Sequence, residues 1–404
     1  MRLDVRTACS LGLLLFAHWA VADQPLELFA SPAPPYQYAA GGTVQGSTVE
    51  ALQCALKDSP WRPRIHMVPQ RRAIHSLERG TIDGYLGMAA SDELDRHAVI
   101  SAPLALEKWY LYSKKPVSSL SDIRIGSVAG SNEATWLQRQ GYQAAMQVSS
   151  LDQLVALVER GRIDGLVIDQ RVMDAYFESD EKLQPAPDLT MQFVRFAPLG
   201  LYLGNNFVNA HPGFLHTFNT RLDSCVTSGF QLESHELSEL HRQTNNLLKS
   251  LQQHVDLEDA LNRSDNSYTL AEILMIDQLW QHSLTNKPTE EAITIAARPA
   301  SHALKKWQAK HEGRISEMML MDDQGALVAI SQHTSDFWQG DEPKFREVVA
   351  QVGDELFIGP VRFDASSQRF QVTASKAIFD DRSGELIGAI AVGVDIEKAL
   401  SGLQ

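Results

Sequence analysis

Long apolar runs are almost absent from this sequence, and the one that it has lies close to its start. Leu11–Val21 is apolar apart from Gly12 and His18. This run is too short to cross a bilayer, and no later stretch approaches the roughly 20 apolar residues that a membrane-spanning helix needs. We therefore expect no transmembrane helix in the remainder of the chain.

The apolar run has the surroundings of a secretory signal peptide. Arg2 and Arg6 give it a basic head, and Ala20–Ala22 supplies a small-x-small cleavage site. We expect residues 1–22 to be removed by cleavage after Ala22. The mature protein would then be periplasmic or secreted.

Cysteine is scarce, with three residues in a chain of 404. Cys9 precedes the apolar run, where it is badly placed for a lipoprotein site, and it would be lost with the signal peptide. The mature chain then keeps only Cys54 and Cys225, and an oxidising compartment favours one disulfide. Two free, buried thiols are the alternative.

Positive charge is in deficit. The chain has 36 Lys and Arg residues against 50 Asp and Glu residues, which gives a net charge of −14. An acidic protein is repelled by phosphate backbones and by anionic lipids. Neither nucleic acid nor an anionic membrane surface is therefore an expected partner.

Motifs of metal binding and covalent catalysis are missing as well. The 13 histidines are scattered and form no His-Glu-x-x-His or comparable metal-binding spacing. No Gly-x-Ser-x-Gly sequence and no Cys–His pairing marks a nucleophile. We expect neither a cofactor nor an enzymatic activity.

One motif is present twice and organises the first half of the chain. Leu77–Gly84 reads Leu-Glu-Arg-Gly-Thr-Ile-Asp-Gly, and Val158–Gly165 reads Val-Glu-Arg-Gly-Arg-Ile-Asp-Gly. The glycine after Glu-Arg suits the left-handed residue that ends a helix, and Ile-Asp-Gly leads into an apolar, strand-like run. A repeated helix–Gly–strand unit predicts two similar α/β lobes. Two unrelated helix–strand joints are the alternative.

Hydrophobic periodicity predicts the other elements of this region. Strands are expected at 26–30, 65–68, 84–89, 109–113, 123–128, 166–169 and 199–203. Helices are expected at 46–56, 69–79, 148–161, 169–176 and 214–229, and one more begins at Gly130-Ser131.

Six short motifs follow one another in a characteristic order. They are Pro34-Pro35-Tyr36, Gly80 before Ile82-Asp83-Gly84, Asp95-Arg96 with Ser101-x-Pro103, Gly130-Ser131, Gly161-x-Ile163-Asp164 and Ser228-Gly229. In this order, the sequence from roughly 25 to 235 resembles the family 3 extracellular solute-binding proteins of the amino-acid-binding type.

The resemblance implies an α/β, bilobal periplasmic-binding-protein fold of type II at 23–235. Lobe 1 would comprise about 23–113 and 206–235, and lobe 2 about 114–205, with the ligand between them. Crossovers near Ser113 and Asn205 would join the lobes. Cys54 and Cys225 would both lie in lobe 1, so a bridge between them is sterically reasonable.

The resemblance also assigns roles to three residues of the cleft. Arg96 would bind the carboxylate of the ligand, because a guanidinium pairs with a carboxylate bidentately. Ser131, at a helix start, would offer backbone N–H groups to the same carboxylate, and Asp169 would hold the ammonium group. The alternatives are a surface arginine paired with a neighbouring aspartate, and plain helix caps at Ser131 and Asp169.

Tyr36 and Arg72 complete the expected ligand site. Tyr36 is the best candidate for an aromatic wall, and a core or rim position is its alternative. Arg72 would place a further cation near the mouth of the cleft, which favours an acidic or multiply charged ligand. A solvated arginine is the alternative reading of Arg72.

The composition changes after Leu237. Leucine and valine recur at helical spacing as far as Leu261, which predicts one long amphipathic helix packed on its own domain; a coiled-coil face is the alternative. A second helix is expected at 270–280. Strands at 315–321 and 326–330 form a hairpin, and further strands are expected at 357–360, 369–374, 378–379 and 386–394.

The last motifs resemble those of a Cache domain, an extracellular PAS-like sensor. They are Met321-Asp322-Asp323-x-Gly325, the segment Thr334–Glu342, and Ile387-Gly388-Ala389-x-Ala391-Val392-Gly393-Val394-Asp395. The resemblance implies an α+β domain at 290–404, a helical leader at 236–289, and a solute pocket on one face of the sheet. Trp338, Asp341 and Arg362 are the pocket candidates, with a core position for Trp338 and a helix cap at Asp341 as alternatives.

Together these features predict a periplasmic solute-binding protein. It would capture a small, polar, amino-acid-like ligand and present the closed form to a membrane transporter or a sensor protein. Closure would be a hinge motion that the ligand drives by contacting both lobes. A dehydratase-like enzyme of the same fold and a ligand-free interaction scaffold are the alternatives.

Overall fold

The computed structural model describes most of the chain. It covers residues 23–142, 146–179, 188–226, 230–264, 267–283, 287–311, 313–350, 355–364 and 369–401. The expected signal peptide and the Ser228-Gly229 motif lie outside these residues. Within them, no helix combines the length and the apolar character needed to cross a membrane.

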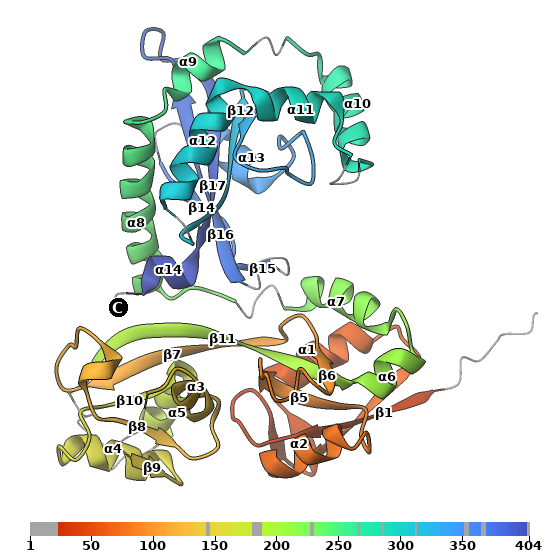
Figure 1. Ribbon diagram of the computed structural model, residues 1–404, viewed down its shortest axis with the longest axis vertical. Helices are drawn as coiled ribbons and strands as arrows, with labels where there is room; N and C mark the ends of the chain where they lie inside the picture. Colours follow the sequence, from red (N-terminus) through yellow and green to blue (C-terminus); the bar gives the residue numbers. More distant parts are fainter. Residues whose placement is uncertain are drawn as a thin grey trace, which may run out of the picture.

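One nine-stranded sheet runs through both lobes of the N-terminal module (Figure 1). Its order is β4 (Trp61–Met67), β1 (Gln24–Ala30), β5 (Gly84–Ala89), β11 (Thr190–Gly204), β7 (Ala105–Ser113), β10 (Gly165–Asp169), β8 (Ile125–Val128) and β9 (Met146–Val148), with β6 (Ala98–Ile100) paired to β11. A separate hairpin joins β2 (Tyr38–Ala40) to β3 (Thr43–Gln45).

Each lobe combines parallel strands with helices, as expected for a bilobal α/β fold. In lobe 1, β1 is parallel to β4 and β5; in lobe 2, β8 is parallel to β9 and β10. The helices are α1 (Ser47–Leu56), α2 (Gln70–Glu78), α6 (Asn205–Ala210) and α7 (Phe214–Cys225) in lobe 1, and α3 (Asn132–Arg139), α4 (Leu151–Glu159) and α5 (Gln170–Ser179) in lobe 2. The predicted bilobal periplasmic-binding-protein fold is confirmed.

The repeated Glu-Arg-Gly motif occupies the same joint in both lobes. Gly80 follows α2 with a φ of 63°, and Gly161 follows α4 with a φ of 65°. A side chain with a Cβ is penalised in this left-handed conformation. Asp83 and Asp164 then accept backbone hydrogen bonds from Glu27 and Arg124, which fix the start of the next strand.

The two crossover strands are longer than the sequence suggested. The run expected at 199–203 is the end of the 15-residue β11, whose first part pairs with β7 and whose last part pairs with β5. All nine residues of β7 are buried. This burial follows from its position, because β7 is covered by the lobes on one side and by the second module on the other (Figure 1).

A disulfide joins Cys54 to Cys225, with 5.9 Å between their Cα atoms. It links α1 to α7, two helices of lobe 1 that are far apart in the sequence. The single disulfide expected from the cysteine content is confirmed, and the alternative of two free thiols is wrong.

The second module contains a six-stranded antiparallel sheet. Its order is β13 (Leu327–Ile330), β12 (Ile315–Asp322), β17 (Leu386–Asp395), β16 (Arg369–Phe379) and β14 (Phe357–Ile358), with β15 (Arg362–Asp364) paired to β16. The helices around it are α8 (Ser234–Gln252), α9 (Leu257–Asn262), α10 (Leu270–Gln281), α11 (Glu290–Ala297), α12 (Pro299–Lys310), α13 (Pro343–Ala350) and α14 (Ile396–Leu400). The expected α+β character is confirmed, and the Cache assignment stays a prediction.

The long helix expected as far as Leu261 is two helices. α8 ends at Gln252, and Asp256 then caps α9 by accepting a hydrogen bond from the backbone of Asp259. Leu240, Leu247, Leu248 and Leu251 of α8 are buried against the sheet, so this face packs on its own domain. Helices α11, α12 and α13 were not predicted.

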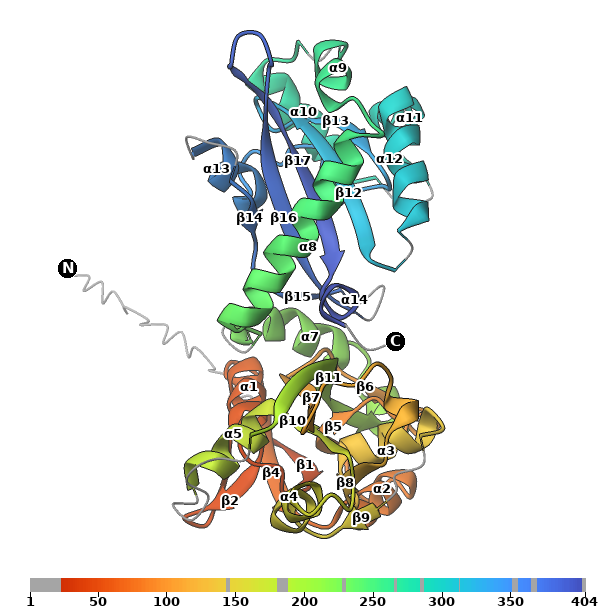
Figure 2. The ribbon, with the colours of Figure 1, turned by 90° about the vertical axis from the view of Figure 1, so that its left-hand side faces the viewer.

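The two modules share a packed interface. Figures 1 and 2 show the second module standing on β7 and β11, with the start of α8 and the whole of α14 at the junction. Phe370 of β16 packs against Phe196 and Phe230, with ring centroids 6.2 and 5.2 Å apart. One apolar core therefore continues from the crossover strands into the second sheet.

Candidate functional site

A cavity of about 340 Å³ lies between the two lobes. Lobe 1 contributes the loop after β1, the start of α2 and β5; lobe 2 contributes the starts of α3 and α4 and the end of β10. Its polar lining includes Gln37, Gln70, Ser131, Glu107 and Glu133. This is the space between the lobes in which the sequence predicted a ligand.

Tyr36 supports this cavity from behind instead of forming its wall. The residue is fully buried. Its hydroxyl lies within hydrogen-bond distance of two acceptors, Asp169 Oδ2 at 2.9 Å and Leu106 O at 3.2 Å. Gly46, with a φ of 120°, caps α1 beside it, and a Cβ there would lie 2.3 Å from Tyr36 O. The core position that was the alternative for Tyr36 is the one observed.

Asp169 joins three parts of the module. Its carboxylate accepts from the Tyr36 hydroxyl of lobe 1, from the backbone N–H of Lys108 at 2.8 Å, and from that of Val172 at 3.1 Å. Burial raises the pKa of Asp169 to about 6, although these hydrogen bonds oppose the rise. The carboxylate therefore caps α5 and holds the lobes together, and it is fully buried behind the lining. This geometry differs from the expected contact with a ligand ammonium group.

Glu107 extends from the crossover strand β7 into the cavity. It is 5% exposed, and its carboxylate accepts from Trp109 Nε1 at 2.9 Å and from Asn132 Nδ2 at 3.2 Å. Burial raises the pKa of Glu107 well above its usual range, and the neighbouring carboxyl groups of Glu133 and Asp169 raise it further.

Glu133 is the second buried carboxylate of the lining. It is 7% exposed in the first turn of α3, and it accepts from the backbone N–H of Asp169 at 3.0 Å. Burial raises its pKa, while hydrogen bonds from its own backbone N–H and from Ser131 act in the opposite direction. Ser131 also caps α3 through Ala134 N at 3.1 Å. Protein oxygens thus accept from Glu133 N and Ala134 N at the start of α3.

The two expected cationic ligand contacts lie away from the cavity. Arg96 is exposed in the segment before β6, whereas Leu94 nearby is fully buried. Arg72 is exposed and lies over the ring of Phe29, 5.9 Å from its centroid. Neither lines the cavity, and the described lining contains no lysine, arginine or histidine.

A different arginine bridges the lobes. Arg139, at the end of α3, donates to Ala90 O at 3.1 Å and to Ser91 Oγ at 2.9 Å, both in lobe 1. Together with the Tyr36–Asp169 bond, this contact closes the cleft over the cavity. In the part of the chain that the structure covers, no group of three or more His, Cys, Asp or Glu side chains could hold a metal ion.

The pocket candidates of the second module are exposed or only half-buried. Asp341 and Arg362 are exposed, while Trp338 is half-buried and donates from Nε1 to Gln324 O at 2.9 Å. A more enclosed polar region lies on the sheet, where Ser375 Oγ is buried without a hydrogen-bond partner among the described residues. Burial also raises the pKa of Glu317 on β12, which β17 separates from β16 in the sheet.

Sequence reasoning missed Glu107, Glu133 and Arg139. One signal for Glu107 was present: Glu107-Lys108 places two charges inside the otherwise apolar segment Ala105–Ser113. Charges in a buried strand are costly unless they are used or paired. Glu133 and Arg139 carry no comparable signal, because an acidic first turn and a basic last turn are ordinary features of a helix.

No protein-family model matches the sequence, and no curated protein matches it. Solved structures match about half of the chain. A histidine kinase sensor domain with similarity to periplasmic binding proteins is 15% identical, with a TM-score of 0.42, and the match covers 51% of this chain and 92% of that one.

Two binding proteins give similar values. An ancestral arginine-binding protein bound to arginine is 18% identical, with a TM-score of 0.40, over 51% of this chain and 98% of its own. A substrate-binding protein of an ABC uptake transporter from Streptococcus pneumoniae, with bound histidine, is 17% identical, with a TM-score of 0.40, over 51% and 88%. At these identities the likeness concerns the fold alone.

Proposed function

We propose that the N-terminal module is a periplasmic solute-binding domain that holds one small polar molecule between its lobes. The observation that carries this proposal is the cavity of about 340 Å³, which residues of both lobes line together. Its volume falls in the range of small-molecule sites, roughly 300–1,000 Å³. A solute in this space would touch both lobes at once, which is the condition for ligand-driven closure.

The contacts that close the cleft support the same proposal. Among the described residues, Arg139 and the Tyr36–Asp169 pair join the lobes by hydrogen bonds, and the crossover strands β7 and β11 connect them covalently. Few bonds would have to break for the lobes to separate and release the solute. Binding would therefore occur by a hinge motion about β7 and β11.

The proposal is binding without turnover. The closed form would be presented to a membrane transporter or to a sensor protein, and the second module would take part in that contact. The buried carboxyl groups of the cleft would serve as ligand contacts in this proposal, and no covalent step is assigned to them. The sequence predicted an amino-acid-like ligand, and the charge of the cleft determines whether a carboxylate group can bind there.

Thermal unfolding of the mature chain with a panel of small solutes tests the proposal. The panel would contain amino acids, amines, dicarboxylates and short peptides. A ligand at 100 times its dissociation constant should stabilise the protein by about 2.7 kcal/mol. Nuclear magnetic resonance of the recovered solute would show whether it has been converted, and conversion would favour the dehydratase-like alternative.

Two matched variants locate the binding. Ala33→Trp fills the cavity from the lobe 1 loop and should abolish the stabilisation by the ligand. Ala39→Trp places the same side chain at an exposed position of the β2–β3 hairpin and should preserve it. A panel without any stabilising member, or a ligand effect that survives Ala33→Trp in a folded protein, would refute the proposed function.

A further inference from the structure

The charge of the cleft is unusually one-sided. Glu107 of β7 and Glu133 of α3 both line the cavity, and both are more than nine-tenths buried. Asp169 lies directly behind them, bonded through its own N–H to Glu133. Three carboxyl groups thus meet at one end of the cavity, and the described lining brings no basic side chain to that end.

The basic residues around the cleft are engaged elsewhere. Arg139 is bonded to Ala90 and Ser91 at the lobe contact. Arg171 lies over the ring of Tyr36, 5.8 Å from its centroid, on α5. Lys108 points to the opposite face of β7, where its Nζ contacts Glu236. None of the ion pairs found in the described chain neutralises Glu107 or Glu133.

The place for an anionic ligand group lies beside buried carboxyl groups. The N-terminus of α3 would be the natural position for a ligand carboxylate, because its N–H groups point into the cleft. Here Ala134 N donates to Ser131, and the carboxylate of Glu133 accepts from its own N–H. A ligand carboxylate in this position would lie beside Glu133 and close to Glu107. Like charges in a site shielded from water repel strongly.

We infer that the solute is a small organic cation without a carboxylate, such as an alkyl diamine or a guanidino amine, bound with Glu107 and Glu133 as its counter-charges. This inference rests on the proposed function and narrows it, since an amino acid would bring the excluded carboxylate. Ammonium and guanidinium groups donate several hydrogen bonds to carboxylates. The remaining polar lining, Gln37 and Gln70 among it, would receive the rest of the molecule.

Binding of a cation should be linked to proton release. Glu107 is faced by Glu133 and Asn132 from α3, by Asp169 from β10 and by Trp109 on its own strand. Among the cations nearby, Arg171 lies over the ring of Tyr36, and Arg195 of β11 lies over the ring of Trp109. Both glutamates have raised pKa values without ligand, and a bound cation favours their ionised forms. Affinity should therefore rise with pH as they ionise.

Isothermal titration calorimetry of the mature chain tests the inference with two matched pairs of probes. 1,5-Diaminopentane and lysine differ only by a carboxylate, as do agmatine and arginine. The amine of at least one pair should bind at least about tenfold more tightly than its amino acid, in line with the strength of a hydrogen bond to a charged group. An amino acid that binds as tightly as its amine, or a preferred dicarboxylate such as succinate, would overturn the inference while leaving the proposed function intact. Failure of every probe, with the wider panel also inactive, would refute both.

Variants then assign the contact. Glu107→Gln and Glu133→Gln keep the shape of the side chains and remove the charge, so each should weaken the binding of the preferred amine by about tenfold or more. Glu93→Gln, at an exposed position of lobe 1, should leave it unchanged. If a cleft variant does not fold, titrations of the native protein at pH 5 and pH 8 replace it. Equal affinity at the two pH values, or full affinity in both folded variants, would contradict the assignment.

Discussion

Lys108 is the residue at which the cleft meets the second module. Its backbone N–H donates to Asp169 Oδ2 on the cleft side. Its Nζ lies on the other face of β7, where it contacts Glu236 at 2.5 Å and Gln231 O at 2.7 Å. Neighbouring residues of a strand point to opposite faces, so Glu107 faces the cavity while Lys108 faces α8. Lys108 and Glu236 are 7% and 2% exposed, which makes this a buried ion pair.

Lys108→Met should strongly destabilise the protein. It leaves the Glu236 carboxylate buried with the hydroxyl of Tyr110 and without its cation, and breaking a buried pair in this way costs about 3–5 kcal/mol. Urea unfolding followed by circular dichroism measures the loss. Arg242→Met, which removes an exposed ion pair with Glu239 on the same helix, is the control and should have little effect. Equal losses of unfolding free energy in the two variants would show that the buried Lys108–Glu236 pair contributes no more to stability than an exposed pair.

The raised pKa of Asp169 predicts how the free energy of unfolding depends on pH. Its pKa of about 6 in the folded protein lies above the value of an unfolded aspartate. The folded state therefore binds a proton that the unfolded state has released, and the free energy of unfolding falls as the pH rises from about 4 through about 6. Asp169→Asn removes this dependence, so the stability of the wild type relative to the variant should decrease over that window. A relative stability that increases with pH would contradict the raised pKa.

Single residues show where sequence reasoning reaches its limit. The N-cap at Ser131 could be predicted from its place before a helix, and the structure has it. Tyr36 and Asp169 were predicted as ligand contacts, whereas the structure bonds them to each other across 133 positions, a contact that depends on how the lobes close. The sequence could not decide which residue of the segment around Arg96 faces the cleft. A shift of two positions exchanges a buried residue such as Leu94 for an exposed one.

At the level of elements, hydrophobic periodicity predicted the helices and strands whose position is determined by burial of an apolar face. α1, α2, β5 and α10 agree with the expected segments within a few residues, since each presents a regular apolar stripe or run. β11 was underestimated, because polar residues such as Gln192 and Arg195 interrupt the apolar residues of its first part. The break between α8 and α9 was missed because the leucine spacing continues across Gln253–Asp256 while the backbone turns.

The disulfide between α1 and α7 should contribute much of the stability of lobe 1. It joins residues 171 positions apart, and a loop of that length lowers the entropy of the unfolded chain enough to stabilise the fold by up to about 5 kcal/mol in the chain-entropy model. The double variant Cys54→Ser with Cys225→Ser should unfold at a lower urea concentration. Treatment of the wild type with a reductant should reproduce this shift, and it should not shift the double variant further. An unchanged midpoint after complete reduction would show that lobe 1 does not depend on the bond.

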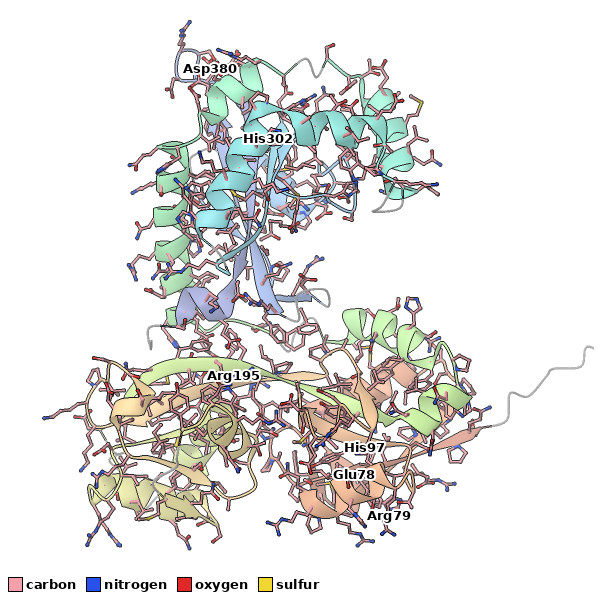
Figure 3. The ribbon with its side chains drawn as sticks, viewed as in Figure 1. Glu78, Arg79, His97, Arg195, His302 and Asp380 are labelled. Carbon is pink, nitrogen blue, oxygen red and sulfur yellow. A yellow bond between two sulfur atoms is a disulfide. The ribbon has the colours of Figure 1, made fainter. Side chains whose placement is uncertain are left out.

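For the molecule as a whole, the crossover strands connect the cavity between the lobes to the second module. Arg195 of β11 lies at this junction (Figure 3). Its guanidinium lies 5.5 Å from the ring centre of Trp109 and 5.6 Å from that of Trp136, and its Nε is 4.0 Å from Glu397 of α14. Trp136 belongs to α3, the helix that carries Glu133 into the cleft. Two routes therefore lead from the cavity to the second module, one through Arg195 to α14 and one through Lys108 to α8.

These two routes predict which part of the second module responds to a ligand. A solute that bridges the lobes should restrain β7 and α3, and through them the start of α8 and the whole of α14, because Lys108 and Arg195 contact these segments. Hydrogen–deuterium exchange with 1,5-diaminopentane should show slower exchange in the first two turns of α8 and in α14, and no change in α10, which makes none of these contacts. Glu107→Gln should remove the effect at the same amine concentration, and Arg195→Ala should reduce it at α14 while preserving it at α8. Protection confined to the lobes would show that the second module does not sense the cleft.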